Sequence, residues 1–600
     1  MKSALSFPAL VSLLALTLCI GGAAAAAAQT GPPPAAQKPA DSKGSEKVDQ
    51  KAPDAKPAAA SEPAVAPETK ALREASQISD PDKQFEALKK VIADFPETSA
   101  AASAESLMVS TLTRKTTADI KALQEQAKKY VEGATTPNEQ ARRMSSAASS
   151  FSGAGVLLDE AEQYAKKSLE MLSDEKTWVA AERKAAAEAR AEALKKDPAA
   201  KPRPEISDAD YSTRFTSMRQ SGMMALGQIH EKKGNAAAAE KTYREAYALS
   251  PKTGGAAALK LADYAKAAGY PFEQLEYLTL ATLAGRVTAA SRAELETVYK
   301  QTHGGTPADL DRMLDERYEK EAVKVDVPAY EPTAKRTSRV VLAELFTGAG
   351  CPPCVAADLA FEAALERYTP DDVAVLVYHL HIPRPDPMTN PFTVTRKEFY
   401  DVPGTPTYFI DGGNQHVGGG AASNARKLFA ETVQPAVDKR LEVKAGAAVS
   451  LQANLGGDKV SVAAKVGKTG KPDQKLRLQI ALVEEMIHYT GENGVRFHPM
   501  VVRAMARGEH DALGFPLAPR KTSKTAYTFD VAKVAADAKA HLDDMEGGSS
   551  QRFGKFRFVE RKSDINRGNL RIVAWVQDEK TKEVLQADSV DLTPAAPKAR

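Results

Sequence analysis

The chain is 600 residues long, which is more than one hydrophobic core normally organises and therefore predicts three or more folded units. Its 81 Lys and Arg residues nearly balance 78 Asp and Glu residues, for a net charge of +3. This balance excludes the strongly basic surface that nucleic-acid-binding proteins typically carry. The 43% of hydrophobic residues is enough to bury real cores.

The first 28 residues have the pattern of an export signal. Lys2 provides a short basic start, the apolar run 9–20 follows, and residues 21–28 are small, as before a signal-cleavage site. Cys19 offers the alternative of a lipid anchor, although the residue before it does not fit a lipobox. No other stretch reaches the ~20 apolar residues of a membrane-spanning helix. The sequence therefore predicts a periplasmic or secreted protein without a transmembrane span.

Residues 29–70 are rich in Ala, Pro and Lys and lack apolar periodicity, which predicts a disordered linker. From 71 to 322 the pattern is almost entirely helical. One segment places small residues and a tyrosine where two paired helices would cross closely: Leu226, Gly227, His230, Gly234, Ala239, Tyr243, Ala246 and Pro251. This segment resembles a tetratricopeptide repeat, and the pattern returns between Leu261 and Ala281.

Stacked helix pairs of this kind form a concave face on which such repeats usually bind a protein partner. We therefore expect a protein partner on the repeats, with a simple spacer as the alternative. The Ala-, Lys- and Glu-rich segment 175–206 predicts an exposed helix or an insertion. Residues 323–338, which contain two prolines and several charges, predict a second linker.

Residues 339–440 alternate between strand and helix patterns. The predicted order is a strand over 340–346, a helix opened by Cys351, a buried strand over 373–382, a helix ending near Tyr400, a strand over 408–410 and a last helix over 422–440. Strands connected through helices in this way predict an α/β unit.

After residue 441 the apolar pattern changes to a period of two. Strands are predicted over 443–451, 459–466, 476–483, 526–531, 570–576 and 584–590. They predict an antiparallel β-sandwich over 441–592, followed by a tail over 593–600. The expected fold is therefore multidomain α + α/β + β, with a helical-repeat solenoid, a central α/β unit and a C-terminal sandwich.

Cys351 and Cys354 are the only cysteines expected after removal of the signal. A cysteine at a helix N-terminus is held partly as thiolate, because the unpaired N–H groups there carry partial positive charge. This predicts Cys351 as an exposed nucleophile and Cys354, one helical turn on, as the thiol that attacks a mixed disulfide. Pro352 and Pro353 remove two backbone donors, so we expect only a modest lowering of the Cys351 pKa.

The Cys-Pro-Pro-Cys loop after a strand, followed about fifty residues later by Thr405-Pro406, resembles the thioredoxin superfamily over residues 339–440. The wider layout is similar to that of secreted bacterial thioredoxin-like proteins with a β-rich C-terminal extension. The resemblance implies a thioredoxin-like fold, a redox-active Cys351–Cys354 disulfide, and a cis Pro406 that packs against it and binds substrate together with Thr405. It implies a thiol-disulfide oxidoreductase that acts on protein thiols and disulfides without a cofactor. The two prolines of the loop, which leave the Cys351 thiolate with fewer backbone donors, favour a reductase or isomerase over an oxidase.

Two positions bear on how closely the chain follows that family. Gly350 stands where thioredoxins usually have Trp, which predicts a reduced aromatic substrate surface. Glu344 is the nearest candidate for the buried acid that exchanges a proton with the second cysteine. Its alternative is a strand-end carboxylate that is solvated or paired with N–H groups.

Other interpretations of the same region remain open. Cys351 and Cys354 with His379 and His381 make a possible zinc set, although the gap between them exceeds the usual zinc-finger spacing. Residues 386–391 are typical of a turn and a helix start and suggest a substrate-facing lip. The loop 489–498 is either a binding loop or a buried polar plug between sheets.

Two functions compete with the enzyme. A non-catalytic envelope adaptor would bind partners through the repeats and the sandwich, with the dithiol inert or regulatory. A metal chaperone would use the same two thiols to carry copper or zinc.

Overall fold

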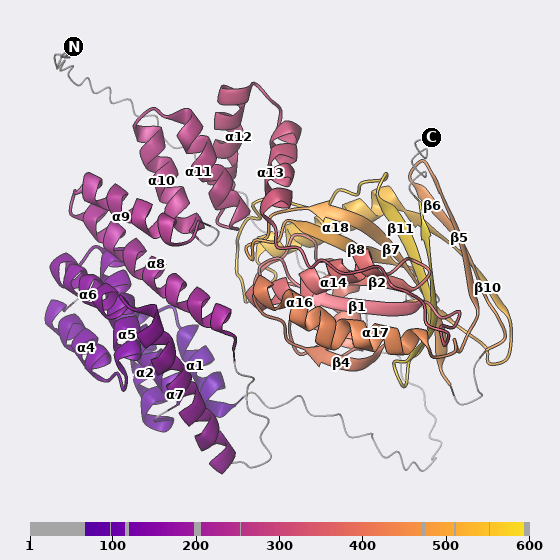
Figure 1. The fold of residues 1–600 in the computed structure, drawn as a ribbon, viewed down its shortest axis with the longest axis horizontal. Coiled ribbons are helices and arrows are strands. Elements are labelled where there is room, and N and C mark those ends of the chain that lie inside the picture. The colour runs from indigo at the N-terminus through magenta and orange to yellow at the C-terminus, as the bar shows by residue number, and fades with distance from the viewer. Residues whose placement is uncertain are drawn as a thin grey trace, which may run out of the picture. The chain divides into compact units, whose positions relative to one another are not determined.

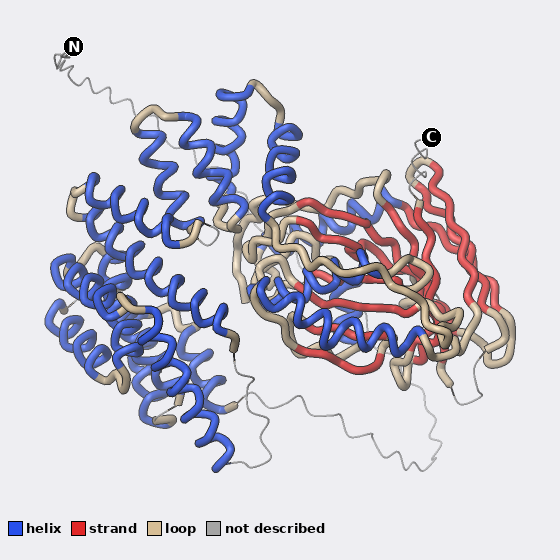
Figure 2. Tube along the Cα trace, in the orientation of Figure 1, coloured by secondary structure: helices blue, strands red, loops and turns tan. Residues whose placement is uncertain are grey.

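The computed structural model describes residues 66–96, 98–114, 119–196, 206–251, 254–469, 474–508, 512–550 and 552–592. The predicted signal, nearly all of the first linker and the tail 593–600 lie outside these residues. The described residues belong to one compact unit. The chain is helical in its N-terminal part and rich in strands in its C-terminal part (Figure 2), as the sequence predicts.

The N-terminal part is built of helices that pair with their neighbours along the chain (Figure 1). They are α1 (Pro67–Ser76), α2 (Pro81–Asp94), α3 (Ser99–Leu112), α4 (Ile120–Glu132), α5 (Pro137–Ala154), α6 (Leu158–Met171), α7 (Glu175–Lys196), α8 (Asp208–Lys232), α9 (Ala236–Leu249), α10 (Gly255–Ala267), α11 (Pro271–Leu283), α12 (Ala289–His303) and α13 (Pro307–Glu321). Tyr243 is completely buried, and a Cβ added at Gly227 would overlap its ring. The close crossing of α8 and α9 predicted from these two residues is therefore confirmed.

The C-terminal part contains a long mixed sheet and a short antiparallel one. Its elements are β1 (Val341–Thr347), α14 (Val355–Arg367), β2 (Val373–His379), α15 (Pro391–Phe399), β3 (Thr407–Ile410), β4 (Gly413–Val417), α16 (Ala425–Leu428), α17 (Gln434–Leu441), β5 (Val449–Gly456), β6 (Lys459–Val466), β7 (Leu476–His488), β8 (Phe497–Met505), β9 (Phe515–Pro516), β10 (Ser523–Asp530), α18 (Val531–Gly547), β11 (Leu570–Asp578) and β12 (Val584–Asp591). The short 3-10 turns Pro352–Cys354 and Ala422–Asn424 precede α14 and α16, and a π-helical turn, Phe429–Val433, separates α16 from α17.

The long sheet has the strand order β12-β11-β7-β8-β2-β1-β3-β4, with β9 attached to β7. Strands β1 and β2 are parallel and fully buried, because α14, α16 and α17 pack with them into one core. Alternate residues of β7 and β11 belong to two different cores, since successive side chains of a strand point to opposite faces. One of these faces packs against the short sheet of β10, β6 and β5.

The structure differs from the separate C-terminal sandwich that the sequence predicted. The strands of residues 441–592 do not form a separate pair of sheets, because β8 pairs in parallel with β2 and joins them to the central sheet. The sequence did not indicate β8, since Pro499, His498 and the buried Arg503 interrupt its apolar pattern. Among the described residues, no helix is long and apolar enough to span a bilayer.

Candidate functional site

The two cysteines lie between the end of β1 and the start of α14 and form a disulfide. The Thr405–Pro406 peptide bond is cis, which confirms the prediction for Pro406. Thr405 contacts Cys351 directly, with its hydroxyl 3.4 Å and its carbonyl oxygen 3.7 Å from the Cys351 sulfur. The structure therefore brings together four of the five residues singled out from the sequence: Cys351, Cys354, Thr405 and Pro406.

The disulfide is covered, so the prediction of an exposed Cys351 is wrong for this state. Cys351 is 1% exposed and Cys354 is completely buried. On one side the segment 418–420, after β4, donates from Gly420 N–H to the Pro353 carbonyl (2.7 Å) and from Gly418 N–H to the Pro406 carbonyl (3.1 Å). On the other side, Asn493 N–H donates to the Ala349 carbonyl (3.0 Å). Neither cover is adjacent in sequence to the cysteines, which is why the sequence did not indicate them.

The glycine segment 418–420 fits its place only because it lacks side chains. A Cβ added at Gly419 would overlap the carbonyl oxygen of Pro353, and Gly420 has a φ of +151°. We expect Gly419→Ala to loosen this cover and to accelerate reduction of the disulfide by dithiothreitol about tenfold. This factor corresponds to about 1.4 kcal/mol, which is near the lower end of the free energy that overpacking typically costs.

The rate is measured by quenching with iodoacetamide and counting alkylated thiols by mass spectrometry. Gly404→Ala is the matched control, because an added Cβ there has no neighbour within 4 Å. Equal rates for Gly419→Ala and the wild type would show that segment 418–420 does not limit access.

A buried carboxylate holds the backbone of the cysteine loop. Asp386 is completely buried and accepts hydrogen bonds from Ala349 N–H (2.6 Å), Met388 N–H (2.8 Å) and His379 Nδ1 (2.9 Å). Although burial opposes ionisation, His379 and the two N–H groups hold the pKa of Asp386 below its ordinary value. The Asp386 N–H in turn donates to His381 Nδ1 (3.0 Å). The loop before Cys351 is thus anchored from the segment after β2.

Two expectations for this segment are corrected by that network. Residues 386–390 are buried and do not form a substrate-facing lip, although a helix does start here as predicted, with Asn390 as the cap of α15. In the zinc interpretation His379 and His381 face the sulfurs, but here both contact Asp386. The described residues contain no group of three or more His, Cys, Asp or Glu side chains arranged to hold a metal ion.

Glu344 does not lie with the cysteines, which corrects the role predicted for it. It is completely buried and pairs with Arg396 of α15 (2.8 Å), while it accepts hydrogen bonds from Tyr378 (2.9 Å) and Tyr400 (2.5 Å). Side chains of a strand alternate between faces. Glu344 and Thr347 are an odd number of residues apart, so Glu344 points to the face of α15 and Thr347 to the face of α14.

Asp358 is the buried acid on the cysteine side of the sheet, and the sequence analysis missed it. It lies on α14 four residues after Cys354, hence one turn along the same helical face. The Thr347 hydroxyl donates to it (2.7 Å). Burial raises the pKa of Asp358 to about 7 and that of Glu362, a turn further on, to about 8. The sequence did contain a signal for Asp358, because Asp358 and Glu362 are the only charged residues in the otherwise apolar segment 355–365.

Most of the loop 489–498 is buried, as in the second of its two predicted alternatives, but Glu492 is exposed and the loop joins the end of β7 to the start of β8. Arg496 is 2% exposed and binds Asp315 of α13 (2.7 Å), and His498 is buried against the Tyr489 carbonyl (2.8 Å). Burial lowers the pKa of His498 to about 3, so it is neutral. The loop therefore connects α13 with the cysteine loop, which it contacts through Asn493.

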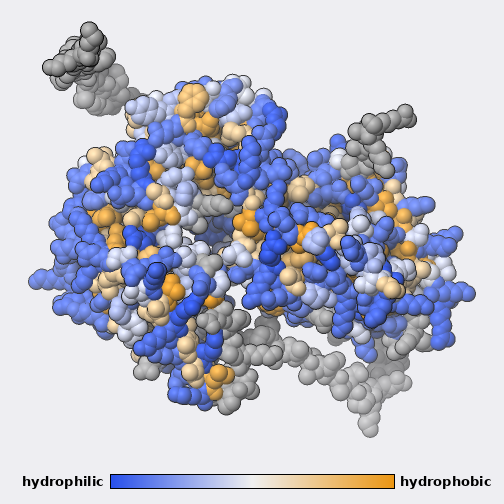
Figure 3. Space-filling model, viewed as in Figure 1, coloured by the Kyte–Doolittle hydropathy of each residue, from blue (hydrophilic) through white to orange (hydrophobic). Residues whose placement is uncertain are grey.

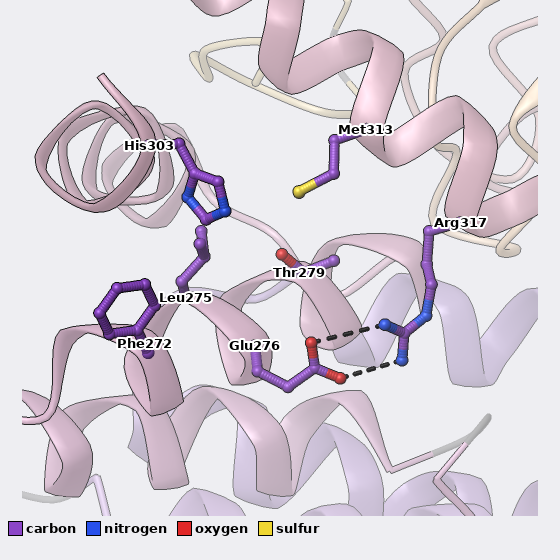
Figure 4. Close-up of a pocket in the computed structure, with 7 residues that line it drawn as sticks. All are labelled: Phe272, Leu275, Glu276, Thr279, His303, Met313 and Arg317. Carbon is purple, nitrogen blue, oxygen red and sulfur yellow. Dashed lines mark hydrogen bonds and ion pairs between the residues drawn. The ribbon is translucent and has the colours of Figure 1, made fainter. Parts of the chain in front are cut away.

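The repeats carry a pocket of their own, of about 240 Å³, between α11, α12 and α13 (Figure 4). Phe272 and His303 flank it on one side, and Arg317 pairs with Glu276 on the other (2.9 Å). Phe272 is 67% exposed. On the face drawn in Figure 3, hydrophobic side chains lie in small groups separated by hydrophilic ones. The protein partner expected on the repeats stays a prediction.

Comparisons with known proteins leave the family of the chain open. No family model matches it, and no curated protein matches it. Among solved structures, the crystal structure of BtubC (BKLC) from P. vanneervenii is 12% identical and covers 45% of this chain and 97% of its own, with a TM-score of 0.27. A likeness of this size supports no conclusion about fold or function.

Proposed function

We propose that the protein is an exported thiol-disulfide oxidoreductase whose residues 339–440 form a thioredoxin-like module. The observation that carries the proposal is the position of the Cys351 sulfur, 3.4 Å from the Thr405 hydroxyl and next to the cis Pro406. A disulfide at the start of a helix, beside a backbone segment able to pair with an extended peptide, is suited to exchange with a protein disulfide. Export rests on the N-terminal sequence pattern.

The chemistry starts from the reduced pair. The Cys351 thiolate attacks one sulfur of a substrate disulfide, whose S–S bond breaks and releases the other sulfur as a thiolate. Cys354 then loses its proton and attacks Cys351, which frees the second substrate thiol and restores the Cys351–Cys354 disulfide. An external thiol or dithiol reduces the pair again.

The proton of Cys354 needs an acceptor close to α14. We assign this role to Asp358 in place of Glu344, because Asp358 lies one turn from Cys354 on the same helix face. A carboxyl group with a pKa near 7 is suited to accept and return a proton at neutral pH.

Turnover of protein disulfides tests the proposal. With dithiothreitol as reductant, the wild type should accelerate the reduction of insulin disulfides, and Cys351→Ser should not exceed the uncatalysed rate. Cys354→Ser should accumulate a mixed disulfide that survives acid quenching. Equal activity of the wild type and Cys351→Ser would exclude the enzyme hypothesis and favour the adaptor.

One observation favours a second candidate, an adaptor in which the disulfide acts as a redox-sensitive lock. Cys351 is 1% exposed, and residues 348–351 are held by Asp386 and Asn493. A disulfide in this position would fix the conformation of the cysteine loop, to which Asn493 of loop 489–498 is hydrogen-bonded. The adaptor predicts that reduction changes the hydrogen exchange of residues 489–496 while insulin disulfides are not turned over.

A further inference from the structure

A second pocket, of about 320 Å³, lies beside the cysteine loop. Its lining comes from four stretches that are distant in sequence: Gly285 and Val287 after α11, Arg384 and Pro385 after β2, and two segments of the C-terminal part. The C-terminal segments provide four aromatic rings, those of Tyr489, Phe553, Phe556 and Phe558. Its volume is near the lower end of small-ligand pockets, roughly 300 Å³, which suits one or two side chains.

The pocket and the disulfide share a wall. Arg384, which lines the pocket, lies against Gly350, since a Cβ added at Gly350 would be 3.2 Å from the Arg384 Cβ. Glu492, also in the lining, precedes Asn493, whose N–H is bonded to the Ala349 carbonyl. A group in this pocket is therefore separated from Cys351 by little more than the backbone of residues 349–350.

The charges in the lining are already paired, so the pocket does not call for a charged occupant. Arg384 pairs with Glu492 (3.1 Å), and Arg557 pairs with Glu546 (2.6 Å). What the lining offers is ring surface: Phe553, Phe556 and Phe558 are all partly exposed, and the rings of Phe556 and Phe558 lie edge to face at 4.9 Å. Pairs of aromatic rings at centroid distances of this size are stabilised beyond the burial of their area, so a further ring in the pocket would bind favourably.

We propose that this pocket binds an aromatic side chain next to the reactive cysteine of a protein substrate. The inference deepens the proposed function and rests on it. Gly350 leaves the position before Cys351 without a ring, and the C-terminal part supplies four rings beside that position. Arg384 and Glu492 form the boundary between the pocket and the cysteine loop. When the cover of the cysteines opens, an extended substrate can therefore reach Cys351 with its cysteine while a neighbouring ring enters the pocket.

The test uses two symmetric peptide disulfides, one of Gly-Phe-Cys-Phe-Gly and one of Gly-Ala-Cys-Ala-Gly. Reduced protein in excess performs a single turnover, and each rate is divided by the rate of the same peptide with dithiothreitol alone. The wild type should prefer the Phe peptide about tenfold, the factor that about 1.4 kcal/mol of ring contact produces. Hydroxyethyl disulfide, which has no side chain, measures thiol exchange by itself.

Two variants alter the pocket in opposite ways. Phe556→Ala removes a ring, and Val287→Trp fills the space. Both should reduce the preference to less than twofold and leave the reaction with hydroxyethyl disulfide unchanged. Phe272→Ala is the matched control, because Phe272 lines the repeat pocket of Figure 4 and not this one, and it should keep the tenfold preference.

The outcomes separate the pocket from the redox chemistry. If the wild type reacts with hydroxyethyl disulfide but treats the two peptides alike, the pocket proposal is overturned and the enzyme stands. If Phe556→Ala and Val287→Trp both keep the preference, it comes from another surface, and the pocket proposal is again overturned. If the wild type reduces none of the three disulfides, the proposed function fails and this inference falls with it.

Discussion

Arg396→Met is expected to destabilise the protein by about 3–5 kcal/mol, because it leaves the buried Glu344 carboxylate without its cation. Arg396 is 1% exposed and binds Glu344 (2.8 Å) and Gln577 (2.8 Å), while its guanidinium lies over the Tyr400 ring (4.6 Å). Coulombic attraction to Glu344 raises the pKa of Arg396 despite the opposing effect of burial. The pair links β1, α15 and β11, so its loss affects the whole central sheet.

Urea unfolding measures the loss as a shift of the midpoint at constant slope. Arg317→Met is the matched control, since Arg317 and Glu276 form an exposed pair that should contribute at most about 1 kcal/mol. The double variant Glu344→Met with Arg396→Met should recover most of the stability, because no unpaired charge then remains buried. A cost below about 1 kcal/mol for Arg396→Met contradicts this account.

Glu344→Gln separates a structural role from a catalytic one. Glu344 points to the α15 face, away from the cysteine helix. We therefore expect the variant to lower stability while the pH dependence of disulfide exchange stays unchanged. A shifted pH profile would return Glu344 to the proton-relay role predicted from the sequence.

The sequence predicted most of the strands and helices around the cysteines, because their patterns are local. The strand predicted over 340–346 is β1 at Val341–Thr347, and the strand over 408–410 is β3 at Thr407–Ile410. The cis Pro406 followed from its resemblance to a family position. Each of these features depends on residues close together in the chain.

The features that decide access and proton transfer could not be predicted in that way. The covers of the disulfide come from Gly418–Gly420 and Asn493, which are remote from Cys351 in sequence. The proton-relay role predicted for Glu344 was wrong because such a prediction requires knowing which face of the sheet each strand residue points to. Asp358 was visible as a charge on an apolar helix, but its importance depends on burial that only the fold supplies.

The two buried acids therefore have opposite environments. Glu344 has a cation and two tyrosine hydroxyls around it, which is the arrangement of a structural ion pair. Asp358 has a single hydroxyl donor, from Thr347, and no hydrogen bond or ion pair with a cation among the described residues. Burial keeps the proton on Asp358 to a higher pH, and the Thr347 hydroxyl and attraction to His379 oppose this only in part. Asp358 is therefore a group that titrates near neutrality one turn from Cys354.

Replacing Asp358 with asparagine is expected to remove a pH-dependent loss of stability. Burial raises the pKa of Asp358 to about 7 from an ordinary value of 3.8. The folded protein then keeps a proton that the unfolded chain has released, so this contribution is complete below about pH 4 and is lost as the pH rises through 7. Between pH 5 and 8 the wild type should lose roughly 2 kcal/mol that Asp358→Asn does not lose.

Unfolding midpoints at several pH values check how the stability depends on pH. A second measurement checks the role of Asp358 in proton transfer. In the wild type, the rate at which Cys354 resolves a mixed disulfide should follow an apparent pKa near 7. Asp358→Asn should lose this dependence and slow the step roughly a hundredfold, as expected for loss of a general base. Glu366→Gln, at an exposed position later on α14, is the control and should change neither. If Asp358→Asn alters stability but leaves the rate profile intact, the acid is structural and the proton of Cys354 leaves by another route.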